Sequence, residues 1–237
     1  MPRATVKPTE EADIRALSLF KGMADESFDA LFRGAYVQNF PPMIELITEG
    51  DPCDFLHVMV GGSVELYASW NGRETTMATV RPVSTFILAA TIRDAPYLMS
   101  ARTIEKSRIV LLPSTDVREV FSTDPVFARA IVDELAKCYR GVIKNTKNLK
   151  LRTSIERLAN YLLRVRKFGD NGDTVHLSME KRRLASYLGM TPENLSRAFK
   201  TLQGYGVEVD GARVTINKID DLTNFAKPEV LIDDFTV

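Results

Sequence analysis

The sequence predicts an α+β protein: a β-rich N-terminal domain, a long central helix, and a C-terminal domain of helices with a β-hairpin. Three observations predict this arrangement. Short β-like runs alternate with turn residues through 41–113, about every ten residues. Apolar residues then recur at alternating steps of three and four through 124–149. A helix–turn–helix pattern covers 184–202, and a hairpin pattern follows it. We divide the chain into three parts, 1–123, 124–150 and 151–237.

The composition is that of an ordinary soluble globular protein, with 45% hydrophobic residues and a net charge of zero. With only Cys53 and Cys138 available, an iron–sulfur cluster or a zinc site that needs four cysteines is excluded within one chain. No apolar run reaches the roughly 18 residues of a membrane span, so we expect no membrane contact. Residues 1–8 lack the apolar core of a signal peptide, so we expect a cytoplasmic protein.

The β-rich region is expected to form a barrel or a sandwich, because short strands separated by turn residues at regular intervals are typical of both. The turn signals include 49–52 and Asn71-Gly72, and Asn-Gly is typical of a two-residue hairpin loop. Short helices are expected before this region, over 9–36. The expected strands are 44–47, 55–60, 63–68, 75–80 and 107–112, and a further short strand is expected over 174–177.

The central segment has the pattern of a coiled-coil seam about three heptads long, opened by Asp124-Pro125. A long seam needs a partner, which favours self-association; the alternative is a long helix packed on its own domain. Cys138 is then a buried seam residue rather than a reactive thiol, and Asn145 is the polar position that sets the register. The seam residues are Ala128, Ile131, Leu135, Cys138, Val142, Asn145 and Leu149.

The stretch 184–202 reads as helix, tight turn and helix. Gly189 can adopt the positive φ of a sharp turn, Thr191 is a good N-cap, and Pro192 suits the first helical position. The second helix has an apolar back of Leu195, Ala198, Phe199 and Leu202, and its front carries Glu193, Ser196, Arg197 and Lys200. Such a front suits a recognition helix in the DNA major groove, although an ordinary amphipathic surface helix has a charged face too.

The flanks of this stretch favour DNA. Asp210-Gly211 between 207–209 and 213–216 predicts a β-hairpin, which directly after a recognition helix is a wing. Residues 151–219 hold 12 Lys and Arg against 7 Asp and Glu, an excess of 12 − 7 = 5 positive charges in a chain of net charge zero. A local positive excess favours phosphates through counterion release.

Three stretches together resemble the CRP/FNR superfamily of bacterial transcription regulators over nearly the whole chain. They are the glycine-punctuated strands of 49–66, the central helix, and Glu193-Asn194-Leu195-Ser196-Arg197, which is similar to the Glu-x-x-Ser-Arg motif of FNR-, FixK- and DNR/NnrR-type members. The chain is most similar to the NnrR, DNR and HbaR branch. The resemblance implies a β-roll sensor domain, a dimerisation helix and a winged helix-turn-helix.

The resemblance also implies a homodimer that binds double-stranded DNA with TTGA-type palindromic half-sites. Glu193, Ser196 and Arg197 would read bases, Lys200 would meet phosphate, and Thr191 would lie at the same interface. It implies RNA polymerase as a partner and the role of an activator, although the sequence does not give the sign of regulation or the target genes.

Two positions depart from the members that bind cyclic AMP. Those members hold the ribose with a Gly-Glu pair and the phosphate with Arg-Ser-Ala. Here Ala89 falls where the glutamate would be, and Met99 falls where the arginine would be. A buried phosphate without its cation costs several kcal/mol, so we do not expect cyclic AMP as the effector.

The remaining candidates are an apolar effector or none. Haem that carries a gas such as NO or O2 is one, on the resemblance to DNR-like members, and a small aromatic acid is another. His57 could ligate haem iron, or it could be a strand residue packed in the roll. The effector pocket implied by the resemblance is formed by Phe86, Leu88, Ala89, Tyr97, Met99 and Ser100.

Two other functional classes fit the sequence less well. An enzyme is not expected, because the sequence has neither a phosphate-binding glycine loop nor a Cys/His or Ser/His/Asp constellation near a recognisable elbow. A cyclic-nucleotide-binding module that regulates a partner protein is the other class. The altered cassette and the intact DNA-facing helix argue against it.

Overall fold

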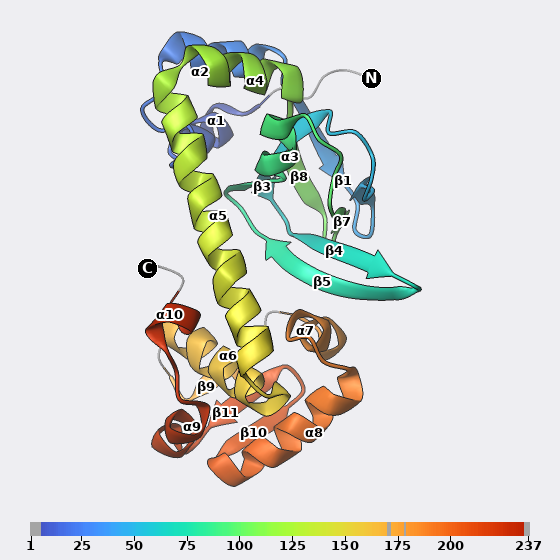
Figure 1. Cartoon of the computed structure of the whole chain (residues 1–237), viewed down its shortest axis with the longest axis vertical. Helices are drawn as coiled ribbons and strands as arrows, with labels where there is room; N and C mark the ends of the chain where they lie inside the picture. Colours follow the sequence, from blue (N-terminus) through green and yellow to red (C-terminus); the bar gives the residue numbers. More distant parts are fainter. Residues whose placement is uncertain (1–5, 170–171, 178, 235–237) are drawn as a thin grey trace. The chain divides into compact units, whose positions relative to one another are not determined.

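The structure is a computed structural model that describes residues 6–169, 172–177 and 179–234 (Figure 1). The chain forms two compact units, 1–137 and 138–237, and each is described by itself. Among the described residues, no helix is both long and apolar enough to cross a membrane. The α+β fold predicted from the sequence is confirmed, with a β domain, a long helix and a helix-turn-helix domain that carries a small sheet.

The N-terminal unit contains two four-stranded antiparallel sheets, ordered β1-β8-β3-β6 and β2-β7-β4-β5. The helices α1, α2, α3 and α4 accompany them. The bounds are α1 Pro8–Arg15, α2 Asp25–Arg33, β1 Tyr36–Phe40, β2 Glu45–Ile47, β3 Phe55–Gly61, β4 Val64–Trp70, β5 Arg73–Val80, β6 Ser84–Phe86, α3 Leu88–Arg93, β7 Ser100–Thr103, β8 Ser107–Pro113 and α4 Ser114–Thr123.

All five strands expected in this region form, and the structure adds β1, β6 and β7. The Asn71-Gly72 hairpin is confirmed, because Trp70 pairs with Arg73 and both loop residues have positive φ. The sequence did not reveal β1, β6 and β7. These strands are short or mostly polar, so apolar and polar residues do not alternate clearly along them.

The side chains of β3 alternate between two cores. Leu56 and Val58 pack in a core with α1, α2 and α4, whereas Met59 packs in a second core with residues of β4, β6 and β7. Both β3 faces are therefore buried, and the strand reads as a continuous apolar run interrupted by His57.

The long helix α5 runs from Pro125 to Leu151. Asp124 caps it as expected: its Oδ1 accepts the N–H groups of Val126 at 2.9 Å and Phe127 at 3.0 Å. Ile131 was predicted for the dimer seam, but its side chain is already covered by residues of its own chain. Ile131 is 0% exposed and packs in the helix-side core of its own domain, where Phe127 is buried beside it. Apolar residues at alternating steps of three and four suit packing on the chain's own domain as well as a dimer seam. The spacing alone could therefore not distinguish these two arrangements.

The C-terminal unit has one apolar core between its helices and an antiparallel sheet ordered β10-β11-β9. The expected hairpin is β10–β11, and Asp210 pairs with Arg213 around Gly211 and Ala212. The bounds are α6 Ser154–Phe168, β9 Thr174–His176, α7 Lys181–Tyr187, α8 Pro192–Leu202, the 3-10 turn Gln203–Tyr205, β10 Val207–Asp210, β11 Arg213–Ile216, α9 Ile219–Ala226 and α10 Val230–Asp233.

Candidate nucleic-acid interface

The turn between α7 and α8 depends on Gly189. Its φ is +64°, in the left-handed region that favours glycine. A Cβ at this position would lie 2.8 Å from Cδ2 of Leu149, at the end of α5. Glycine therefore serves both the backbone conformation of the turn and the close approach of α5.

The start of α8 is fixed by Thr191 and Pro192. Thr191 Oγ1 accepts the N–H of Asn194 at 3.2 Å. Pro192 occupies the first turn, where backbone N–H groups have no partner within the helix, so the N–H that proline lacks is not needed. This is the N-cap expected from the sequence. The first turn of α8, which carries Glu193, is exposed to solvent.

The two faces of α8 are those the sequence predicts. Its apolar back is buried in the core of the C-terminal unit, whereas the five residues assigned to DNA are all exposed. They are Thr191, Glu193, Ser196, Arg197 and Lys200. The structure thus brings together, along α8 and its N-cap, every residue expected at the interface.

Glu193 is held ionised at the start of α8. A backbone N–H in the first turn and the Thr191 hydroxyl lower the pKa of the Glu193 carboxyl below its usual range, and Arg197 one turn on adds to this. Ser196 Oγ donates to the backbone oxygen of Pro192 at 3.1 Å. The front of α8 therefore offers an ionised acceptor, a hydroxyl oxygen and a guanidinium within two turns.

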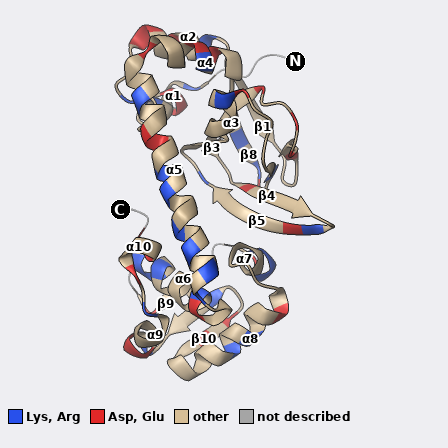
Figure 2. Ribbon diagram, in the orientation of Figure 1, with Lys and Arg blue, Asp and Glu red and all other residues tan. Residues whose placement is uncertain are grey.

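Beside α8 lies a groove that the sequence did not reveal. It has a volume of about 380 Å³ and lies between Lys181 at the start of α7, the side of α8 that carries Ser196, Phe199 and Lys200, and Val209 of β10. Lys181 and Lys200 contribute its cations, and the Lys181 ammonium lies 5.8 Å from the centre of the Phe199 ring. Figure 2 marks the lysines and arginines of α7 and α8. Lys181 could be noticed in the sequence only as part of the basic run 181–183.

The remaining seam residues of α5 differ in exposure. Cys138, Val142 and Leu149 are exposed, whereas Leu135 and Asn145 are half-buried. Large apolar side chains of α5 outside the predicted seam are also exposed, among them Val132 at 59% and Tyr139 at 68%. The structure thus leaves an apolar stripe on α5, and its contact with a second copy stays a prediction.

The residues predicted to line an effector pocket do not all lie together. Phe86 and Tyr97 are buried in the core between the sheets, beside half-buried Met99. Ser100 lies at the start of β7, where its Oγ accepts the N–H of Glu49 at 2.9 Å. In contrast, Leu88 packs in the helix-side core, and Ala89 is exposed on the first turn of α3. The expected set is therefore divided between two cores and the surface.

His57 is a packed strand residue in this structure. It is 5% exposed, and its ring stacks on Phe86 with 4.9 Å between ring centres. Burial lowers the pKa of His57 to about 4, so the imidazole is neutral near pH 7. A haem at this imidazole would have to displace Phe86, so the described residues do not fit His57 as an axial ligand in this arrangement.

Two protein-family models match the chain. The model described as "Cyclic nucleotide-binding domain" matches 37–124, and the model described as "Crp-like helix-turn-helix domain" matches 156–225. The first spans the two sheets and the second spans α6 through most of α9, including α8.

Full-length relatives agree with these matches. A protein of Lacticaseibacillus casei named "Probable transcriptional regulator flp" is 27% identical over 213 residues, which cover 88% of this chain and 95% of that protein. The "CRP-like cAMP-activated global transcriptional regulator" of Mycobacterium tuberculosis is 23% identical over 215 residues, which cover 88% and 96%. The structure of FixK2 from Bradyrhizobium japonicum shares the fold, with a TM-score of 0.67, 23% identity, and coverage of 80% of this chain and 96% of that one.

Proposed function

Because the chain belongs to the CRP/FNR family of transcription regulators, we propose that it acts as a homodimer that reads a TTGA-like palindrome with α8. As a member of that family it is a DNA-binding regulator and not an enzyme. The specific branch, the DNA sequence, the dimer and the effector all belong to the proposal.

The observation that carries the proposal is the outward face of α8. Arg197 can donate two hydrogen bonds to O6 and N7 of a guanine, and ionised Glu193 can accept from N4 of a cytosine. Lys200, at the edge of the groove beside α7, suits a phosphate. The TTGA sequence itself comes from the likeness of Glu193-Asn194-Leu195-Ser196-Arg197 to the family motif.

The dimer is supported by the exposed apolar stripe of α5. Tyr139 is 68% exposed and Val142 is 62% exposed, which is unfavourable for a helix that stays alone in water. A two-fold dimer would place two α8 helices on the two half-sites of a palindrome. RNA polymerase as a partner and an activator role rest on the family and on relatives named activators, such as Anr of Pseudomonas aeruginosa.

For the sensor domain, we propose an effector other than a cyclic nucleotide. Arg102 is the cation of β7, but its guanidinium already pairs with Glu65 at 3.0 Å and Glu74 at 3.1 Å. Arg118 likewise pairs with Asp94 at 3.0 Å. Both guanidinium groups are therefore already paired with carboxylates and would have to give up these partners to bind a cyclic phosphate. The alternative guests are haem with a gas, a small aromatic acid or none.

Cyclic AMP is the second candidate, because the matched domain model is described as cyclic nucleotide-binding and one relative is named cAMP-activated. Calorimetric titration separates the two. We expect no heat of binding at millimolar cyclic AMP, whereas micromolar affinity would overturn the proposal for this domain. A haem titration that gives a sharp Soret band at one haem per chain would identify that guest; a featureless one would leave the aromatic acids to be screened by thermal shift.

Fluorescence anisotropy tests the DNA proposal. The probe is a duplex with inverted TTGA half-sites whose centres are about one helical turn apart, and the control duplex has the same bases in shuffled order. We expect the palindrome to bind about a thousandfold more tightly at physiological salt, with two chains per duplex. Equal affinity for both duplexes would overturn the proposal. Binding of cyclic AMP without any DNA affinity would favour a nucleotide-binding module that acts on a protein partner.

A further inference from the structure

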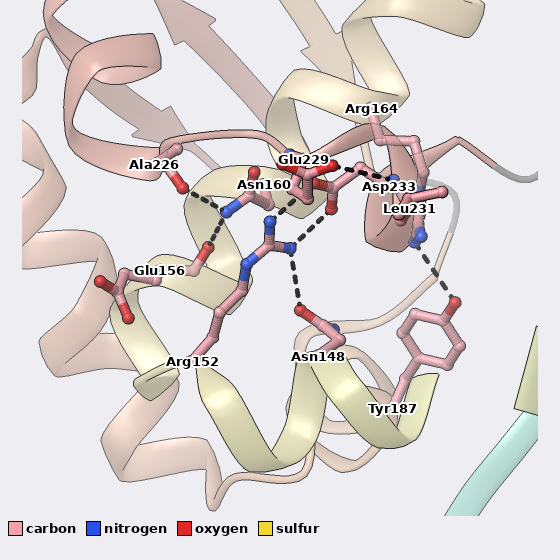
Figure 3. A network of polar contacts seen from close by, with 10 residues as sticks. All are labelled: Asn148, Arg152, Glu156, Asn160, Arg164, Tyr187, Ala226, Glu229, Leu231 and Asp233. Carbon is pink, nitrogen blue, oxygen red and sulfur yellow. Dashed lines mark hydrogen bonds and ion pairs between the residues drawn. The ribbon is translucent and has the colours of Figure 1, made fainter. Parts of the chain in front are cut away.

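Residues 227–234, the last described segment, fold back on the α5–α6 junction. After α9, Lys227 takes a left-handed conformation and the chain continues into α10, where Ile232 is buried. Figure 3 shows the polar contacts that result. This tail, residues 227–234, meets residues of both α5 and α6.

The central contact is a partly buried ion pair between Arg152 and Asp233. The two terminal nitrogens of Arg152 donate to the two carboxylate oxygens of Asp233 at 2.6 and 2.7 Å, and one also donates to Asn148 Oδ1 at 3.2 Å. The Arg152 side chain is only 8% exposed. A bidentate, charge-assisted pair has a strict geometry, and removal of one partner leaves a buried charge uncompensated.

Other contacts tie the tail to both helices. From α5, the Lys144 ammonium donates to the backbone oxygen of Asp234. From α6, Lys167 lies 3.6 Å from the Asp234 carboxylate. Asn160 Nδ2 also donates, at 2.8 Å, to the backbone oxygen of Ala226, the last residue of α9 and the one directly before the tail. The tail therefore contacts α5 through Lys144 and the C-terminal end of α6 through Lys167.

The bridged junction is short. α5 ends at Leu151 and α6 begins at Ser154, so 152–153 alone connect them. Thr153 caps α6 in a capping box: its N–H donates to Glu156 Oε2 at 2.7 Å, and its Oγ1 accepts the Glu156 N–H at 3.4 Å. The backbone angles of two residues set the angle between the helices, and the Arg152–Asp233 pair restrains one of those residues.

The junction is also connected to the turn that precedes α8. Arg157 donates to the backbone oxygens of Arg152 at 2.7 Å, Leu188 at 2.8 Å and Gly189 at 3.2 Å. A change in the angle at 152–153 would therefore be passed to the start of α8 through one guanidinium.

We propose that the tail is a clamp that sets the angle between α5 and α6, and that Asp233 is a positioning residue for the spacing of DNA half-sites. In a dimer joined through α5, this angle fixes where the two α8 helices stand relative to each other. The spacing part of this inference rests on the proposed function; the clamp itself does not require DNA.

The clamp is tested first without DNA, by hydrogen exchange of the backbone amides of 152–157. Two variants break it differently: Asp233→Asn leaves Arg152 buried without its carboxylate, whereas a chain that ends after Glu229 opens Arg152 to water and so avoids a buried charge. Asp221→Asn is the matched control, because its carboxylate is 57% exposed and pairs only at 3.9 Å.

We expect the amides of 152–157 to exchange about tenfold or more faster in both clamp variants. Both variants lose a hydrogen bond between charged groups, and such bonds stabilise more than neutral ones, so the junction opens more often. The control should exchange at the wild-type rate. Wild-type exchange rates at 152–157 in the shortened chain would overturn the clamp, whatever the DNA result.

The second measurement is half-site spacing. Wild type and the shortened chain are titrated with the palindrome and with the same palindrome lengthened by one base pair between half-sites. We expect the shortened chain to lose about tenfold or more of the discrimination between these duplexes, while its affinity for a single half-site stays the same. Unchanged spacing discrimination with faster exchange would overturn the positioning role of Asp233. Failure of the wild type to prefer any palindrome would instead count against the proposed function.

Discussion

Substitution of Gly189 by alanine tests how closely α5 and the helix-turn-helix are packed. Two costs follow from the structure. At φ +64°, a Cβ costs about 1–2 kcal/mol in the left-handed region. The same Cβ would lie 2.8 Å from Leu149 Cδ2, so the leucine must leave its rotamer at a cost of about 0.5–1.5 kcal/mol. Together they lower the free energy of unfolding by about 1.5–3.5 kcal/mol.

Gly211→Ala is the matched control. Gly211 also has positive φ, +59°, but a Cβ there would meet no atom within 4 Å. Gly211→Ala should therefore cost only the backbone part, about 1–2 kcal/mol. The difference of about 1 kcal/mol between the two variants measures the overlap with Leu149.

The assay is urea unfolding followed by far-ultraviolet circular dichroism, with hydrogen exchange of the α8 amides as the local readout. Fluorescence would not serve, because the one tryptophan, Trp70, lies in the N-terminal unit. In a double-mutant cycle, Leu149→Ala should remove the extra cost of Gly189→Ala. If the two glycine variants lose equal free energy of unfolding, or if the effects of Gly189→Ala and Leu149→Ala simply add, then a Cβ at position 189 does not overlap with Leu149.

The remaining predictions concern DNA, assembly, the effector and acid stability. Arg197→Ala should cost about 1–3 kcal/mol on the palindrome and little on shuffled DNA, whereas Lys200→Ala should weaken both alike; anisotropy titrations compare them. Tyr139→Asp with Val142→Asp should give monomers by light scattering, and a surviving dimer would place the interface elsewhere. Cyclic AMP should not raise the melting temperature, because stabilisation by mass action requires affinity for the folded state. The folded pKa of His57, about 4, lies below its unfolded value of 6.5, so the unfolded state binds the proton first. Stability is then complete above pH 6.5 and falls by about 3 kcal/mol as the pH drops to 4; His57→Gln should flatten this slope in pH-dependent denaturation, and an unchanged slope would contradict it.

Local sequence patterns predicted the helix-turn-helix well. The period of α8 separates its buried back from its exposed front, and Thr191 and Gly189 mark its beginning without reference to distant residues. Asn71-Gly72 located a hairpin for the same reason. In these cases the structural signal lies within a few residues of the element it defines.

Features that depend on distant neighbours were not predictable. The period that placed Ile131 on an interface is equally satisfied by the core of its own domain. The expected pocket residues are adjacent in sequence, but strand and helix geometry sends Phe86 and Leu88 to different cores. Arg152 and Asp233 are 81 residues apart, and no local pattern connects them.

The contact between α8 and a base is tested most directly when the guanine of each TTGA half-site is replaced by 7-deazaguanine, which removes only the N7 acceptor. If Arg197 reads O6 and N7 together, this change should weaken wild-type binding by about 1–3 kcal/mol per half-site and leave the Arg197→Ala variant unaffected. Equal losses in both proteins would show that Arg197 does not contact this guanine and would contradict the assignment of α8 as the recognition helix.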